Sequence, residues 1–121
     1  MVSLIACLST GKGTWTEVFK LINVHKWDKV YLIVNSFVKD NLTLPKNCKL
    51  IIINSNSSLE QMVQTIKKEI KIDDLEVALN IISGSGKEHT AILETVLELG
   101  LNFRFVTLND KQEMVSLGLN S

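Results

Sequence analysis

Several residue types are scarce in this 121-residue chain, and each scarcity excludes a class of site or partner. Two cysteines and two histidines, with no CxxC pair, do not suffice for a structural zinc centre. The number of Lys and Arg residues (13) only equals the number of Asp and Glu residues (13), so the chain has no excess of positive charge with which to bind long nucleic acid. The first apolar run, residues 2–8, has no basic flank and is far shorter than the roughly 20 residues that span a bilayer. We expect a cytoplasmic protein with no membrane partner, metal or cofactor.

The common nucleotide-binding motifs are also missing. A P-loop needs a glycine five residues before Gly-Lys and a hydroxyl after it, but Gly86-Lys87 has Ile81 and Glu88 there. The other Gly-Lys pair, residues 11–12, fails in the same way. The dinucleotide fingerprint fails because Thr16 and His89 stand where its third glycine belongs. The missing motifs therefore argue against an ATPase and against a nicotinamide-dependent enzyme.

Apolar runs and amphipathic stretches alternate along the whole chain, of which 45% is hydrophobic. The runs predict five strands, at residues 2–8, 29–34, 49–53, 76–82 and 102–108. Amphipathic spacing predicts helices from 14 to about 25, from 57 or 58 to about 70, from about 88 to 99, and at 110–117. Residues 35–45 are irregular or hold a short helix. This pattern predicts one domain over residues 1–121, an α/β Rossmann-like three-layer sandwich with a mainly parallel five-stranded sheet.

Capping residues set the expected helix starts. Thr14 with Glu17 predicts a capping box for the first helix. Either Ser57 with Glu60 or Ser58 with Gln61 opens the later one, and both alternatives fit the sequence.

Two loops of similar composition follow the first and fourth predicted strands. They read Ser-Thr-Gly-Lys-Gly (9–13) and Ser-Gly-Ser-Gly-Lys (83–87), and each leads into a helix. Glycine permits close backbone approach, helix N-termini offer amide donors, and lysine adds charge, so together the loops suit a phosphorylated ligand. Strand orders 3-2-1-4-5 and 2-1-3-4-5 both fit the pattern, and we favour the first because it brings the two loops together. Ordinary turn and cap residues are the simpler interpretation of either loop alone.

Other candidate residues have plain structural interpretations. His89 could act as an acid or base, but we find no Asp or Cys near it to complete a triad. Glu88 could orient Lys87, although a first-turn glutamate is the simpler account. Trp15 could stack on a base but suits the core better, and Asn80, inside an apolar strand, could brace a loop or satisfy local backbone.

The fourth-strand segment resembles a motif of CARF domains, the CRISPR-associated Rossmann fold. There an apolar strand with an embedded Asn runs into a Thr/Ser-Gly-Gly/Ser-Thr-Lys turn, and residues 78–87 read Ala-Leu-Asn-Ile-Ile-Ser-Gly-Ser-Gly-Lys. Residues 9–11 resemble the other ligand loop of the family. The resemblance covers all five predicted strands. The sequence departs from the motif at Gly86, where threonine is expected. We expect no room for an effector domain in these 121 residues, so the chain is a sensor module, a degrader of the messenger or a piece of something longer.

The resemblance implies a homodimer that binds cyclic oligoadenylate, a small cyclic RNA messenger of CRISPR antiviral signalling, across its two-fold axis. Some relatives are ring nucleases, in which a ribose 2′-hydroxyl attacks the adjacent phosphate without a metal. By position, the implied ligand contacts are Ser9, Thr10, Gly11, Lys12, Ser83, Gly84, Ser85, Gly86 and Lys87. Ser9 and Lys87 are the implied catalytic residues, with Lys87 stabilising the charged phosphorane.

Three hypotheses remain open at this point. The chain is a sensor that binds the ring, an enzyme that cleaves it, or a protein-interaction module whose glycine loops are only caps. In the third hypothesis the surface of the predicted terminal helix, with Met114, Val115 and Leu117, matters most.

Overall fold

A computed structural model describes residues 2–9, 14–43, 47–73 and 75–117. In chain order the elements are β1 (Ser3–Leu8), α1 (Trp15–Val24), β2 (Val30–Val34), α2 (Ser36–Asn41), β3 (Cys48–Ile52), α3 (Leu59–Glu69), β4 (Glu76–Asn80), α4 (Gly86–Glu98), β5 (Asn102–Leu108) and β6 (Met114–Ser116). Strands and helices alternate as far as β5, which is the pattern predicted from the apolar runs. Pro45 lies outside the described residues.

The strands form one mostly parallel sheet in the order β3-β2-β1-β4-β5-β6. The favoured order of the first five strands is thus confirmed, and the fold is α/β and compatible with a Rossmann-like sandwich. The predicted count of five strands falls short by one. β6 pairs antiparallel with β5, with Thr107 opposite Val115.

The residues of β6 were predicted to be helical, and that prediction was wrong. The Asn109 side chain accepts hydrogen bonds from the amides of Lys111 and Glu113, both at 2.9 Å, and the chain turns back along β5. Eight residues are too few to hold a helix on their own, whereas a strand gains the open edge of β5. The terminal helix whose surface the protein-interaction hypothesis singled out is thus replaced by a strand at Met114–Ser116.

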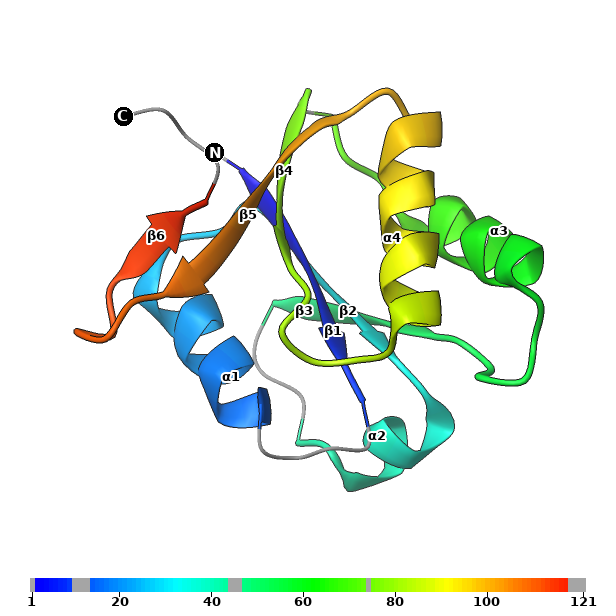
Figure 1. The fold of residues 1–121 in the computed structure, drawn as a ribbon, viewed down its shortest axis with the longest axis horizontal. Coiled ribbons are helices and arrows are strands. Elements are labelled where there is room, and N and C mark those ends of the chain that lie inside the picture. The colour runs from blue at the N-terminus through cyan, green and yellow to red at the C-terminus, as the bar shows by residue number, and fades with distance from the viewer. Residues whose placement is uncertain (1, 10–13, 44–46, 74, 118–121) are drawn as a thin grey trace.

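Helices cover both faces of the sheet, giving three layers (Figure 1). Alternate residues of β1 point to opposite faces: Ile5 and Cys7 pack with residues of α3 and α4, while Leu4, Ala6 and Leu8 pack with residues of α1. Val38 of α2 belongs to the α1 side. Every residue of β1 and β2 is buried, as expected for strands covered on both faces.

The ends of the helices agree with the sequence in part. Ser58 and Gln61 form the capping box of α3, which decides between the two alternatives for that helix. Thr14 is the N-cap of α1, but its side chain makes no capping hydrogen bond, so that predicted box is not formed. Gly100 follows α4 with φ +70°, the left-handed conformation that ends many helices.

Candidate functional site

The first requirement for a site is met at the carboxyl edge of the sheet. β1 and β4 are neighbours, with Ala6 opposite Asn80, although the paired positions are 74 residues apart in sequence. The strand order reverses between these two strands, which is where open α/β sheets bind ligands. In Figure 1 the loop from β4 to α4 curves past the end of β1.

A hydrogen bond joins the two predicted ligand loops. The amide of Ser9, directly after β1, donates to the hydroxyl of Ser83 at 3.0 Å. The indole of Trp15 donates to the carbonyl of Ser9 at 2.7 Å, so the first described turn of α1 holds the same residue from the other side. Trp15 is buried in the core, in line with its structural interpretation. Ser83 is buried too, so its hydroxyl braces the two loops and is not a free ligand contact.

Asn80 fixes the end of β4. Its amide nitrogen donates to the carbonyl of Val106 on β5 at 2.9 Å, and its oxygen accepts from the amide of Ile82 at 3.3 Å. The side chain thus braces a neighbouring strand and satisfies local backbone at once. Both interactions fix where the chain leaves the sheet to form the loop at residues 83–85.

Gly84 is packed so tightly that a side chain there would force its neighbours to shift. Its φ is +110°, and a Cβ there would lie 2.6 Å from Cys7 Sγ and 3.0 Å from His89 Nε2. His89 Nε2 lies 2.8 Å from the Ser83 carbonyl. Because a carbonyl only accepts, this nitrogen carries the proton. Cys7 and His89 therefore both lie against Gly84, although they are far apart in the sequence.

The cysteine beside His89 is not a nucleophile. Burial raises the pKa of the Cys7 thiol far above its usual value, and the nearby charge of Glu88 raises the pKa further. A thiol that stays protonated and is fully buried cannot attack a substrate. The burial of Cys7 thus argues against a Cys–His hydrolase at this site.

Glu88 and Ser85 form the N-terminal cap of α4. The Ser85 amide donates to Glu88 Oε1 at 2.7 Å, and the Glu88 amide donates to the Ser85 hydroxyl at 3.4 Å. The amides of Gly86 and Lys87 lie outside this reciprocal pair. They remain at the positive end of the helix dipole, where an anion binds most readily.

Lys87 points in a direction that the sequence did not reveal. Its ammonium donates to the carbonyl of Ser57 and, at 3.4 Å, to that of Ser55, both in the loop before α3. Among the described residues Lys87 forms no ion pair with Glu88, so the suggestion that Glu88 orients it is not supported. Lys87 instead ties the start of α4 to the loop that follows β3.

A depression of about 270 Å³ lies at this edge. It is lined by Ser9, Asn35, Ser55, Met62, Gly84, Ser85, Lys87 and Glu88, which come from the ends of four parallel strands and the helices after them. Four predicted contacts, Ser9, Gly84, Ser85 and Lys87, lie together here. Thr10, Gly11 and Lys12 lie outside the described residues, so their place relative to the depression is not assigned.

Three lining residues were missed or discounted in the sequence. Asn35 caps α2 by accepting from the Val38 amide at 2.9 Å, and from the sequence it was placed only in an irregular segment or short helix. Ser55 lies in a loop that resembles any cap-rich turn. Glu88 was read as a solvated glutamate, yet only 5% of it is exposed. Their positions in the chain could have identified these three residues, because each one follows a parallel strand or lies at the start of the next helix.

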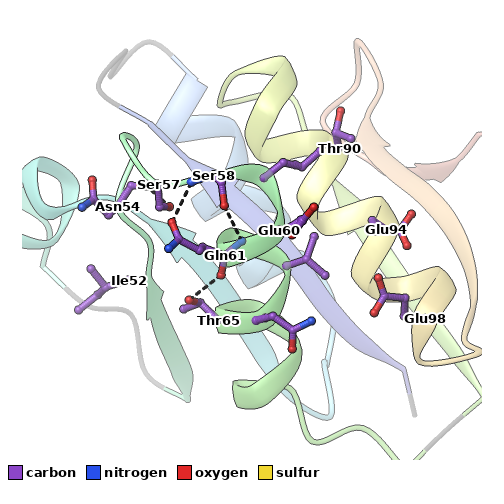
Figure 2. A pocket seen from close by; sticks show the side chains of 13 residues that line it. Ile52, Asn54, Ser57, Ser58, Glu60, Gln61, Thr65, Thr90, Glu94 and Glu98 are labelled. Atoms are coloured by element: carbon purple, nitrogen blue, oxygen red, sulfur yellow. Dashed lines mark hydrogen bonds between the residues drawn. The ribbon is translucent and has the colours of Figure 1, made fainter.

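A larger groove of about 1210 Å³ runs over the outer surface of α3 (Figure 2). Figure 2 shows Glu94 and Glu98 of α4 on one side of α3 and Ile52 of β3 on the other. A hydrogen bond shared with Glu98 raises the pKa of Glu94, whereas hydrogen bonds from Glu94 and Lys67 lower that of Glu98. The described residues that line the groove include no lysine or arginine, and its carboxylates would repel an anionic ligand. The smaller depression is therefore the better candidate site.

Comparison with protein-family models and with curated proteins found no match. In the part of the chain that the structure describes, no helix is long and apolar enough to cross a membrane. Across residues 2–9, 14–43, 47–73 and 75–117, no three His, Cys, Asp or Glu side chains are grouped so that they could hold a metal ion.

Proposed function

We propose that this chain is a CARF-like Rossmann domain that binds a cyclic oligoadenylate at the carboxyl edge of its sheet, as a homodimer in antiviral signalling. The observation that carries the proposal is the Ser9–Ser83 hydrogen bond between the loops after β1 and β4. It supports the arrangement that the CARF resemblance requires, in which both loops serve one ligand. The Gly86 and Lys87 amides and the Lys87 ammonium supply donors for phosphate oxygens.

The size of the depression favours a site shared between two copies. At about 270 Å³ it falls below the roughly 300–1,000 Å³ of pockets that enclose a drug-sized ligand. A cyclic tetranucleotide is larger than such a ligand, so one chain holds part of the ring and a second chain holds the rest. We therefore expect one ring for every two chains.

Gly86→Asp is the sharpest test of this site. Gly86 has open space around its Cα, and it is the first residue of α4. An aspartate there favours the helix through its dipole but repels phosphate. We expect Gly86→Asp to fold normally and to bind cyclic tetra-adenylate or hexa-adenylate at least tenfold more weakly than the natural chain in isothermal titration. Leu59→Asp adds the same charge at the first residue of α3, outside the depression, and controls for net charge.

Two results would overturn the proposal: no binding of either ring by the natural chain, or equal binding by the Gly86→Asp variant. Lys87→Ala is a less selective test, because it removes the tether to Ser55 and Ser57 as well as a cation. Chromatography of the same mixtures in EDTA separates the sensor from the ring nuclease. Linear products would assign cleavage, with Ser9 and Lys87 as the catalytic residues, and intact ring would assign a sensor.

A further inference from the structure

The groove over the outer surface of α3 combines negative charge with exposed apolar side chains (Figure 2). Glu60 of α3 and both Glu94 and Glu98 of α4 line it. Across α3 from the two α4 glutamates, Ile52 at the end of β3 is 42% exposed, and Leu59, the first residue of α3, is 38% exposed. The surface therefore offers two kinds of contact, ionic and apolar, within one groove.

The folding of α4 does not account for the charges of Glu94 and Glu98. Like charges four residues apart destabilise a helix, and Glu98 is the last residue of α4, at the negative end of the helix dipole. The hydrogen bond shared with Glu98 raises the pKa of Glu94, which shows how closely the two carboxyl groups approach. Lys67 pairs with Glu98 at 3.1 Å, but among the described residues Glu94 forms no ion pair. A cation from outside the chain would relieve this repulsion.

Glu60 differs from the α4 pair, because it lies in the first turn of α3, where the helix dipole favours a carboxylate. Its charge is explained by folding alone. The argument for a partner therefore depends on Glu94 and Glu98, and Glu60 only adds to the negative potential of the groove.

The size and composition of the groove favour a polypeptide as the partner. At about 1210 Å³ it exceeds the roughly 300–1,000 Å³ of pockets that hold small molecules. A metal ion is a poorer complement, since the described parts of the chain hold no three His, Cys, Asp or Glu side chains suitably grouped. Lysine or arginine would pair with the carboxylates, and apolar side chains would cover Ile52 and Leu59. A helix with both features on one face is a basic amphipathic helix.

We infer that the groove over α3 docks a basic amphipathic helix of a partner protein, with cationic side chains at Glu94 and Glu98 and apolar side chains at Ile52 and Leu59. New ion pairs replace the repulsion between two carboxylates, and apolar burial adds to the affinity. Because the charges are exposed, the affinity should fall as the salt concentration rises. The groove and the depression proposed for the ring share no lining residue, so this inference does not depend on ring binding.

The probe is a fluorescein-labelled synthetic peptide of leucine and lysine at helical spacing, and fluorescence anisotropy measures its binding. A scrambled peptide of the same composition and a peptide with glutamate in place of lysine are the controls. We expect the natural chain to bind the amphipathic peptide about tenfold more tightly than the scrambled one, and not to bind the glutamate peptide.

Variants of the chain locate the peptide. Combining Glu94→Gln with Glu98→Gln should weaken binding about fivefold to tenfold, because two partly exposed ion pairs are lost. Leu59→Gln should weaken it about threefold to tenfold through lost apolar contact. Asp28→Asn combined with Asp40→Asn removes two exposed carboxylates outside the groove and should keep the natural affinity.

Three results would overturn the inference: no binding of the amphipathic peptide, equal binding of the scrambled peptide, or full affinity in the Glu94→Gln, Glu98→Gln variant. The thermal unfolding midpoint of that variant should not fall, which separates lost binding from lost folding. Sedimentation velocity tests a different occupant. Self-association that the variant abolishes would assign the groove to a second copy of this chain and would also overturn the inference. Ring binding by the variant should be unchanged, so either proposal can fail without the other.

Discussion

Gly84 shows how a single residue shapes the candidate site. Its left-handed φ of +110° turns the chain from β4 toward α4, and its missing side chain lets Cys7 and His89 approach the backbone. The two requirements act separately, since the first concerns backbone conformation and the second concerns space. Gly100 has only the first requirement, with φ +70° and no atom within 4 Å of an added Cβ.

We expect Gly84→Ala to lower the free energy of unfolding by about 2–5 kcal/mol, the sum of left-handed strain and overpacking. Gly100→Ala carries the strain alone and should cost about 1–2 kcal/mol. Urea denaturation followed by circular dichroism measures both. Equal losses for the two variants would show that the contact with Cys7 does not matter.

Cys7 makes stability depend on pH at the alkaline end. Because the pKa of its thiol is raised in the folded state, chiefly by burial, the folded chain keeps a proton that the unfolded chain releases. The contribution of this thiol to the free energy of unfolding is constant below the ordinary thiol pKa of about 9. Above that pH the contribution falls by up to about 1.4 kcal/mol per pH unit. Urea midpoints between pH 7 and 10.5 should decline more steeply for the natural chain than for Cys7→Ala. Parallel declines would contradict this.

At the scale of elements, the hairpin from β5 to β6 shows where local sequence misleads. Residues 110–117 carry apolar side chains at helical spacing, but the bonds from Lys111 and Glu113 to the Asn109 side chain favour a turn. Gln112 takes a left-handed φ of +63° to complete it. A similar conflict affects α1, where Glu17, expected in a capping box, instead accepts a bond from Thr107 on β5 at 3.3 Å. In both cases an interaction with β5 outweighs the local pattern: strand pairing for β6 and a side-chain hydrogen bond for Glu17.

The turn gives a stabilising substitution. Gln112→Gly removes the strain of a left-handed glutamine and should raise the free energy of unfolding by about 1 kcal/mol. Asn47 has the same φ of +63°, but asparagine tolerates this conformation better, so Asn47→Gly should gain less. Thermal unfolding compares the two variants. A loss of stability on Gln112→Gly would mean that its exposed bond to Lys20 matters more than the strain.

At the scale of the whole molecule, the strand order and the meeting of two loops could be predicted from the sequence. The apolar runs marked buried strands, and the matching loops after the first and fourth favoured an order that makes those strands neighbours. The direction of Lys87 and the place of Cys7 beside His89 could not be predicted, because they depend on contacts between segments far apart in the chain. The sixth strand was missed for a different reason, because the apolar spacing of residues 110–117 also fits a helix and β6 pairs with the strand directly before it.

The sheet also predicts an order of local stability. β1 lies between β2 and β4 with all six residues buried, whereas β6 is a three-residue edge strand of intermediate burial. Amides of β1 should exchange only through global unfolding, and those of β6 at least a hundredfold faster through local opening. Hydrogen exchange followed by mass spectrometry resolves the two. Equal protection would show that β6 is part of the cooperative core.

The bond from Trp15 to Ser9 places an intrinsic fluorophore at the rim where the ligand is proposed to enter. The second tryptophan, Trp27, lies at the opposite rim, next to Asp28, whose amide donates to Val2 ahead of β1. The fluorescence of the natural chain thus combines the emission of Trp15, near the proposed binding edge, with that of Trp27, which lies far from it. Replacing Trp27 with phenylalanine would leave a single optical probe, able to time the arrival of a ligand on a stopped-flow instrument without any label.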